Sequence, residues 1–256
     1  MSVRRLLAPL AVVAAALGAW ELYVDLGGVA PIVLPAPHAI AVAMYTGRAQ
    51  LWSNFLVTAE EVLLGIAAGV SVALVLAVAI HLSQTLRQAV YPLVIASQAI
   101  PIVMLAPLLI FWLGFGLLPR LATIAVVTFF PVVVTTLAAL EAVDPELVKL
   151  FRTLDASRAQ CFLRVELPSA LPGLFTGAKL AAVYSVIGAY LAEQTGSSSG
   201  LGYLFTIDDA QSLAAQAFAA IAILSIFAIA LFTILAAAER YALPWAYQSR
   251  KGTPNT

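Results

Sequence analysis

The stretch "ELVKLFRTLDASRAQCFLRVELPSALPG", Glu146–Gly173, decides how the rest of the chain is interpreted, because it carries four basic residues within sixteen positions of an otherwise apolar protein. The 256-residue chain is 62% hydrophobic and 10% charged, whereas a soluble domain has about 45–50% apolar and about 25% charged residues. Apolar runs of about 20 residues are typical of transmembrane helices. The sequence therefore predicts an integral membrane protein in which this stretch lies outside the bilayer.

Continuous apolar runs on both sides of the stretch predict an all-α helical bundle, and their lack of alternation argues against a barrel. About six runs approximate the length that crosses the hydrocarbon core: Leu6–Val24, Phe55–Ile80, Ala89–Leu113, Leu121–Leu140, Leu171–Ala192 and Ala214–Ala238. We interpret residues 1–256 as one transmembrane domain, with a polar loop at 141–170 and a disordered tail at 248–256. The first run is also compatible with a secretory signal, although a retained membrane helix is the simpler interpretation.

The basic residues predict how these spans are oriented. If the N-terminus is inside, only Arg48 and Arg120 fall in external segments, and ten basic residues fall in cytoplasmic ones. The ten are Arg4, Arg5, Arg87, Lys149, Arg152, Arg158, Arg164, Arg240, Arg250 and Lys251. Because cytoplasmic loops carry an excess of lysine and arginine, we expect both termini and the charged stretch to be cytoplasmic.

Residue spacing within the stretch predicts two short amphipathic helices separated by a turn at Asp155. The apolar residues of the first helix recur at i, i+3, i+4 and i+7: Leu147, Leu150, Phe151 and Leu154. Asp155 or Ser157 is expected to cap the second helix, and Pro168 and Pro172 to end it, because proline lacks the amide hydrogen. Such a pair could lie on the membrane surface or form a docking surface for a cytoplasmic partner, and the spacing leaves both interpretations open.

The same stretch resembles the cytoplasmic "EAA" loop of the membrane subunits of binding-protein-dependent ABC importers. That pattern is E-A-A, three residues, G, nine residues, I, one residue, L-P, and it fits Lys149-Leu150-Phe151, Asp155, Val165 and Leu167-Pro168. Asp155 stands at the glycine position, where aspartate tolerates a left-handed backbone better than most residues. The resemblance implies a coupling helix that contacts a separate ATPase through a set of residues: Lys149, Arg152, Asp155, Ala156, Ser157, Arg158, Phe162, Leu167 and Pro168.

Two further stretches, Ser97–Gly116 and Leu167–Phe205, resemble the sulfonate, taurine, nitrate and pyrimidine group of these importers. The resemblance implies a permease that works as a homodimer in the lipid of a bacterial inner membrane. Its partners would be a dimeric cytoplasmic ATPase that holds ATP and Mg²⁺, and an extracytoplasmic substrate-binding protein. The chain lacks the G-x-x-x-x-G-K-[ST] phosphate loop, so we expect it to be no enzyme and to hold no cofactor. The zero net charge argues against nucleic acid, and the sequence separation of His38 and His81 argues against a metal site.

The substrate is predicted from the fifth span. Tyr184–Gly188 resembles the permeases for hydroxymethylpyrimidine, a thiamine precursor, and for related riboflavin-type compounds. An aromatic wall with a few hydrogen-bonding groups suits such a flat heteroaromatic ring. Alkanesulfonate, taurine or nitrate is the alternative substrate, and a secondary transporter or a membrane sensor is a more distant alternative function.

Several residues within or beside the spans are candidates for the translocation path. Pro101 and Pro107 are expected to kink or interrupt the third span, and broken helices often line transport pathways. The path candidates are Gln98, Pro101, Tyr184, Ser185 and Tyr190. Helix packing is the alternative role for the two tyrosines and the serine. Glu193 is expected at the outer mouth, where it would contact the binding protein or be solvated.

Charged residues within membrane spans are costly and often functional. We expect Glu60 and Glu61 to be solvated at the interface or paired locally. Lys179 is expected to extend its side chain toward the cytoplasm, with an inter-helix pair or a gate as the alternatives. The segment "GSSSGLG", Gly196–Gly202, is flexible by composition.

Overall fold

The computed structural model describes residues 3–249, and every regular element among them is a helix. The first half contains α1 (Val3–Gly27), α2 (Pro37–Thr46), α3 (Arg48–Leu82), α4 (Gln84–Ala96), the 3₁₀ turn η1 (Ser97–Ala99) and α5 (Ile102–Leu113). The second half contains α6 (Leu117–Glu141), α7 (Pro145–Thr153), α8 (Arg158–Cys161), the π-turn η2 (Phe162–Glu166), α9 (Leu167–Gly196), α10 (Leu201–Ala210), α11 (Ala214–Ala242) and α12 (Pro244–Ser249).

Five stretches of the described chain are long and apolar enough to cross a membrane, and the bent pair α4–α5 makes a sixth if it is counted as one span. The predicted all-helical membrane bundle is therefore confirmed. The predicted disordered tail at 248–256 mostly lies outside the described residues, but Gln248 and Ser249 end helix α12 rather than belonging to a tail.

The centre of the bundle is formed by α3, α6 and α9, which pack closely because glycines remove side chains from their contacts. A Cβ at Gly65 would overlap Ile124, a Cβ at Gly69 would overlap Thr128, and one at Gly177 would overlap the Thr135 side chain. Lipid tails are as apolar as the side chains, so helices associate in a membrane through such close packing rather than through the hydrophobic effect. These small residues therefore fix the three helices against one another.

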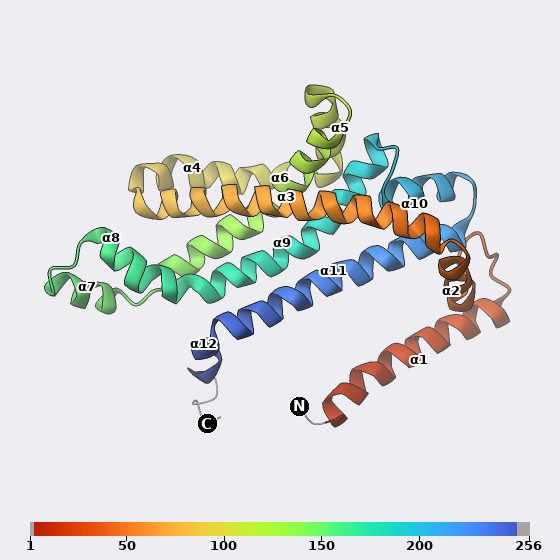
Figure 1. The fold of residues 1–256 in the computed structure, drawn as a ribbon, viewed down its shortest axis with the longest axis horizontal. Coiled ribbons are helices and arrows are strands. Elements are labelled where there is room, and N and C mark those ends of the chain that lie inside the picture. Colours follow the sequence, from red (N-terminus) through yellow and green to blue (C-terminus); the bar gives the residue numbers. More distant parts are fainter. Residues whose placement is uncertain (1–2, 250–256) are drawn as a thin grey trace.

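The predicted third span is broken rather than continuous, because α4 and α5 meet at an angle of 104°. Pro101 stands before the first residue of α5, and Ile100 before it has an extended backbone, as is usual for a residue that precedes proline. The expected interruption at Pro101 is thus confirmed. Pro107 lies inside α5, which continues past it. Figure 1 shows α5 turning away from the long helices.

The expectation that Pro168 and Pro172 end a short helix is wrong. Instead, α8, η2 and α9 form one helical stretch, Arg158–Gly196, of 39 residues. The amide of Leu167 bonds the carbonyl of Phe162, five residues back, which is the π-type pattern. Pro168 follows one residue after this π-type turn, so the proline that lacks an amide hydrogen lies where the regular i to i−4 bonding is already interrupted. The second half of the polar loop and the fifth span are therefore continuous.

The long helices run between two differently built ends. Figure 1 shows α7 and α8 at one end, and α2 and α10 at the other, where α1 ends and α11 begins. Helix α1 lies apart from the bundle in this view, and only 6% of its apolar window is buried. Its contact with the rest is made through α2 and through the Trp20 and Phe218 rings, whose centroids are 6.4 Å apart.

Candidate functional site: a charged segment and a helix anchor

The charged segment, residues 144–168, is a turn between two capped helices. The Asp144 carboxylate accepts a hydrogen bond from the Glu146 amide at 2.8 Å and caps α7. Asp155 has a φ of 56°, so it adopts the left-handed conformation expected at the glycine position of the motif. Ser157, not Asp155, caps α8, and it does so in a reciprocal capping box with Gln160. The local geometry therefore follows from the residues at these positions.

Two polar contacts and one ring contact join the charged segment to the end of α3. The imidazole of His81 lies 2.7 Å from the Glu166 carboxylate, and the Arg158 guanidinium donates to the Leu82 carbonyl at 2.7 Å. The His81 ring also packs against Phe162, with centroids 6.1 Å apart. A displacement of the segment therefore acts directly on α3.

The surface of the segment combines a polar cleft with an exposed apolar face. A cleft of about 340 Å³ is lined by His81, Glu166 and, from α7, Lys149 and Arg152. Lys149 also pairs with Glu146 at 2.7 Å. The apolar side chains predicted for one face of α7 are mostly exposed: Leu147, Leu150 and Leu154. Ala156, Leu167 and Pro168 are half-buried.

At the opposite end, three side chains hold the first amides of α10, in an arrangement that we call the α10 anchor. Asn54 Oδ1 accepts from the Gly200 amide at 2.8 Å, Thr58 Oγ1 from the Leu201 amide at 2.9 Å, and Glu193 Oε2 from the Gly202 amide at 2.6 Å. The first amides of a helix have no partner within it, so these side chains from α3 and α9 satisfy them.

Glycine is required at positions 200 and 202 because other groups of the protein lie too close to admit a Cβ, not because the chain must be flexible there. Gly200 has a φ of +105°, and a Cβ there would overlap the Glu193 carboxyl group. A Cβ at Gly202 would approach the Tyr190 carbonyl oxygen to 2.7 Å. Of the stretch Gly196–Gly202, only residues 197–200 lie outside helices, and the anchor holds its C-terminal end in place.

Beside the anchor lies a buried acid–base cluster of two carboxyl groups, Glu61 and Glu193, and one guanidinium, Arg120, which pairs with Glu61. Glu61 is 1% exposed and Glu193 is 0% exposed. Arg120 pairs with Glu61 and donates to the Ser197 hydroxyl at 3.0 Å. Within the described residues, Glu61 Oε2 and Glu193 Oε1 are buried without a hydrogen-bond partner. The cluster thus has one more acid than base.

The structure places Glu193, Lys179 and Glu61 differently from the expectations for these charged residues. Glu193 is buried, so it does not reach an external protein in this conformation. Lys179 does not extend to the cytoplasm but pairs with Glu239 of α11 at 2.7 Å, the inter-helix alternative. Glu60 is exposed as expected, but Glu61 is neither solvated nor paired locally, because it is buried and pairs with Arg120, which is 59 residues away. Partners so distant in sequence leave no periodic signal.

The path candidates on α9 point in different directions. Tyr190 lines a groove of about 360 Å³ between α9 and α11, together with Ser225 and apolar residues. Its ring packs edge-on against Phe205, with centroids 5.5 Å apart. Tyr184 is exposed outside this groove. Ser185 is fully buried and donates to the Ala182 carbonyl at 2.8 Å, so in this conformation it has the helix-packing role that was the alternative.

The two remaining path candidates lie at the break in the third span. Gln98 is exposed in the 3₁₀ turn η1, and Pro101 is exposed at the start of α5. Neither lines the groove between α9 and α11. The structure therefore separates the predicted path residues into a groove member, Tyr190, and residues on other faces.

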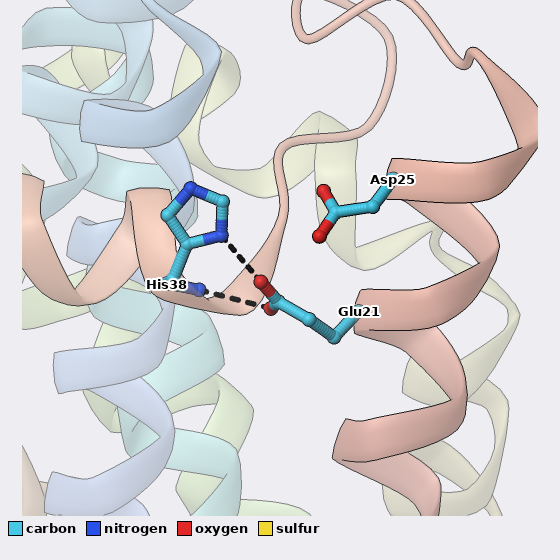
Figure 2. A group of neighbouring side chains, drawn as sticks. All are labelled: Glu21, Asp25 and His38. Atoms are coloured by element: carbon cyan, nitrogen blue, oxygen red, sulfur yellow. Dashed lines mark hydrogen bonds and ion pairs between the residues drawn. The ribbon is translucent and has the colours of Figure 1, made fainter.

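A further polar group, Glu21, Asp25 and His38, lies between α1 and α2. The Glu21 carboxylate accepts from the His38 amide at 3.1 Å and contacts the His38 imidazole, and Asp25 lies beside them (Figure 2). One ligand atom from each lies within 4.8 Å of the others, a donor set that a divalent cation could use, although sequence separation argued against a metal site. The Glu21 carboxylate is already engaged at the start of α2, so we interpret the group as a link between these helices.

The chain is similar to known proteins over most of its length. Residues 65–244 match the family described as "Binding-protein-dependent transport system inner membrane component". The formylaminopyrimidine transport permease protein ThiX of Halalkalibacterium halodurans is 33% identical over 88% of this chain and 90% of its own length. The riboflavin transport system permease protein RibX of Chloroflexus aurantiacus is 32% identical over 88% and 85%.

More distant similarities extend this group. The taurine transport system permease protein TauC of Escherichia coli is 27% identical over 88% of this chain and 85% of its own length. A solved amino acid ABC transporter superposes with a TM-score of 0.65 at 16% identity, covering 78% of this chain and 97% of that chain. At this identity the solved structure supports the fold alone.

Proposed function

The chain belongs to the family of inner membrane components of binding-protein-dependent transport systems, and on that premise we propose that it forms the translocation path for a small, flat heteroaromatic such as a thiamine-precursor pyrimidine. Membership makes it a multi-pass inner membrane permease that is not itself catalytic, and it implies a separate ATPase and a binding protein as partners. ATP and Mg²⁺ then belong to the ATPase.

The groove between α9 and α11 carries the proposal for the substrate class. Its walls are mostly apolar, and the hydroxyl-bearing side chains of Tyr190 and Ser225 also line it. Such a lining suits a flat ring with a few hydrogen-bonding atoms. The relatives named for formylaminopyrimidine and riboflavin transport are 33% and 32% identical. We infer a similar substrate from both observations.

An anion such as taurine or an alkanesulfonate is the second candidate, since the taurine permease is 27% identical. An anion in a membrane path requires cations or helix N-termini. In the described bundle, the half-buried cations Arg120 and Lys179 both pair with carboxylates. Neither is available to an anion without breaking a pair, which favours a neutral ring.

The charged segment is proposed as the surface on which the ATPase docks. The exposed leucines of α7 offer an apolar face, and the cleft beside it holds Lys149 and Arg152. The contacts of His81 and Leu82 of α3 with Glu166 and Arg158 of the segment would transmit ATPase movement to α3. The bundle then alternates between outward-open and inward-open states as packed elements. Both termini are cytoplasmic in this proposal, because the basic residues lie mainly at this end.

A second copy of the chain is proposed to cover α5. This helix leaves the bundle and exposes Phe111 at 84%, and the loop that follows it exposes Phe115 at 81%. The native chain has a single cysteine, Cys161, which is buried. A Phe111→Cys variant in a Cys161→Ser background should therefore form a cross-linked dimer in membranes, whereas Ile229→Cys on α11 should not. Absence of a cross-link at Phe111 would contradict this arrangement.

Uptake of labelled hydroxymethylpyrimidine, with labelled taurine in parallel, tests the substrate in cells with and without the gene. We expect loss of pyrimidine uptake alone. Tyr190→Leu should then lower pyrimidine uptake about tenfold, while Tyr184→Leu, on the same helix but outside the groove, should have a small effect. Loss of taurine uptake alone would overturn the proposed substrate and support the anion.

ATPase docking is tested separately by Leu150→Glu, which places a charge on the exposed face of α7. The variant should lose co-purification of the ATPase and uptake together, because the apolar contact is removed. Thr153→Glu provides a matched control, since Thr153 lies at the exposed polar end of the same helix. Retained ATPase binding in Leu150→Glu would contradict the docking proposal.

A further inference from the structure

We propose that the groove between the start of α3 and the middle of α11 binds one anionic phospholipid. The groove has a volume of about 380 Å³ and is lined by apolar side chains and one cation, Arg48. It is separate from the groove of Tyr190, which lies between α9 and α11. The site does not depend on which substrate the permease carries.

The apolar wall of the groove is held in place by ring contacts. The Trp52 and Phe55 rings stack with centroids 5.4 Å apart, and Phe55 meets Phe227 of α11 edge-on at 5.1 Å. Ring pairs at these distances favour a defined geometry beyond their burial. The wall is therefore formed before any ligand enters.

Arg48 supplies the polar recognition at one end of the groove. Its guanidinium donates to the Tyr45 carbonyl at 2.9 Å and lies over the Tyr45 ring, 4.8 Å from the centroid. No carboxylate pairs with it among the described residues. A guanidinium has five N–H donors in a fixed fork that matches phosphate oxygens, so several donors are left for a phosphate group.

The position of Arg48 explains why the occupant is a lipid rather than a soluble molecule. It is the first residue of α3, next to Tyr45 and Trp52, and these residue types gather where a membrane meets water. From Arg48 to Phe55 the groove follows α3 for about 10 Å. A phosphate at Arg48 would therefore place an acyl chain along the aromatic wall. A net negative headgroup is favoured over a zwitterionic one, because the cation of a zwitterionic headgroup offsets the attraction between its phosphate and Arg48.

Fluorescence quenching by brominated lipids tests the site, because Trp52 lines it. The other three tryptophans, Trp20, Trp112 and Trp245, are replaced by phenylalanine, and the protein is reconstituted in phosphatidylcholine vesicles. Dibromo-phosphatidylglycerol or dibromo-phosphatidylcholine is then titrated in. We expect the anionic lipid to associate with the Trp52 site about fivefold more strongly than the zwitterionic lipid.

Two variants decide what causes the preference. Arg48→Gln should abolish it, and Arg48→Lys should retain part of it, because the charge remains and the fork is lost. Arg240→Gln is the matched control, since it removes one exposed charge near the end of α11 and should leave the preference unchanged. Equal quenching by both lipids in the parent protein, or an unchanged preference in Arg48→Gln, would overturn the proposal. Quenching by neither lipid would also overturn it and would indicate a protein occupant.

Discussion

The charged segment and the buried acid–base cluster both use acids and bases, but in opposite environments. Lys149 pairs with Glu146, and Arg87 with Glu141, through side chains that are at least 43% exposed. Glu61 and Glu193 are almost fully buried around Arg120. Exposed pairs contribute little and can exchange partners, whereas a buried charge that loses its partner is costly. The difference indicates that one end is suited to changing contacts and the other to keeping them.

Among the variants considered, removal of Arg120 should lower the free energy of unfolding the most. Arg120→Met leaves the buried Glu61 carboxylate without its base, so the free energy of unfolding should fall by about 3–5 kcal/mol. Denaturant unfolding of the purified protein in micelles measures this change. Glu61→Gln in the Arg120→Met background should restore more than half of the loss. If the double variant is as unstable as the single one, charge balance does not explain the effect.

Replacing Gly200 tests the α10 anchor. Gly200→Ala forces a side chain into the left-handed region and against Glu193, which should cost about 1–3 kcal/mol and raise hydrogen exchange at the first amides of α10. Gly18→Ala is the control, because a Cβ there meets nothing within 4 Å and lies in a helix. Unchanged exchange in α10 would show that the anchor adapts, contrary to its proposed rigidity.

Removing the cap of α8 tests the opposite end. Ser157→Ala loses one half of the capping box, at a cost of about 1 kcal/mol. Because the charged segment is proposed to contact the ATPase, we expect about fivefold weaker ATPase binding with unchanged unfolding of the spans. Binding measured in detergent with the ATPase in excess checks this. A loss of global stability with normal ATPase binding would instead assign the cap a purely structural role.

The smallest effect is expected for the exposed pair between α4 and α6. Arg87→Met removes the contact with Glu141 at 2.8 Å, and the free energy of unfolding should change by less than about 1 kcal/mol. Unfolding of Arg87→Met and Arg120→Met under the same conditions directly compares an exposed pair with a buried one. A loss as large as that of Arg120→Met would mean that burial does not separate the two regions.

Local chemistry made much of this molecule predictable, and long-range pairing limited the rest. The apolar runs predicted the spans, and Asp155 at the motif's turn has the backbone conformation expected there. The break at Pro101 followed from proline's missing amide. By contrast, Glu61 meets Arg120 and Lys179 meets Glu239 across 59 and 60 residues. Such pairs depend on how helices pack, so a single sequence with no periodic signal does not show them.

The continuous helix from Arg158 to Gly196 also constrains how this chain can change in evolution. It joins the charged segment to Glu193 without an intervening loop. An inserted residue in an α-helix rotates everything after it by about 100°, which would turn Glu193 away from α10 while the segment stayed in place. The π-turn η2 is the one stretch of this helix with an extra residue per turn. Deletions should therefore be accepted at η2 and rejected between Leu167 and Glu193.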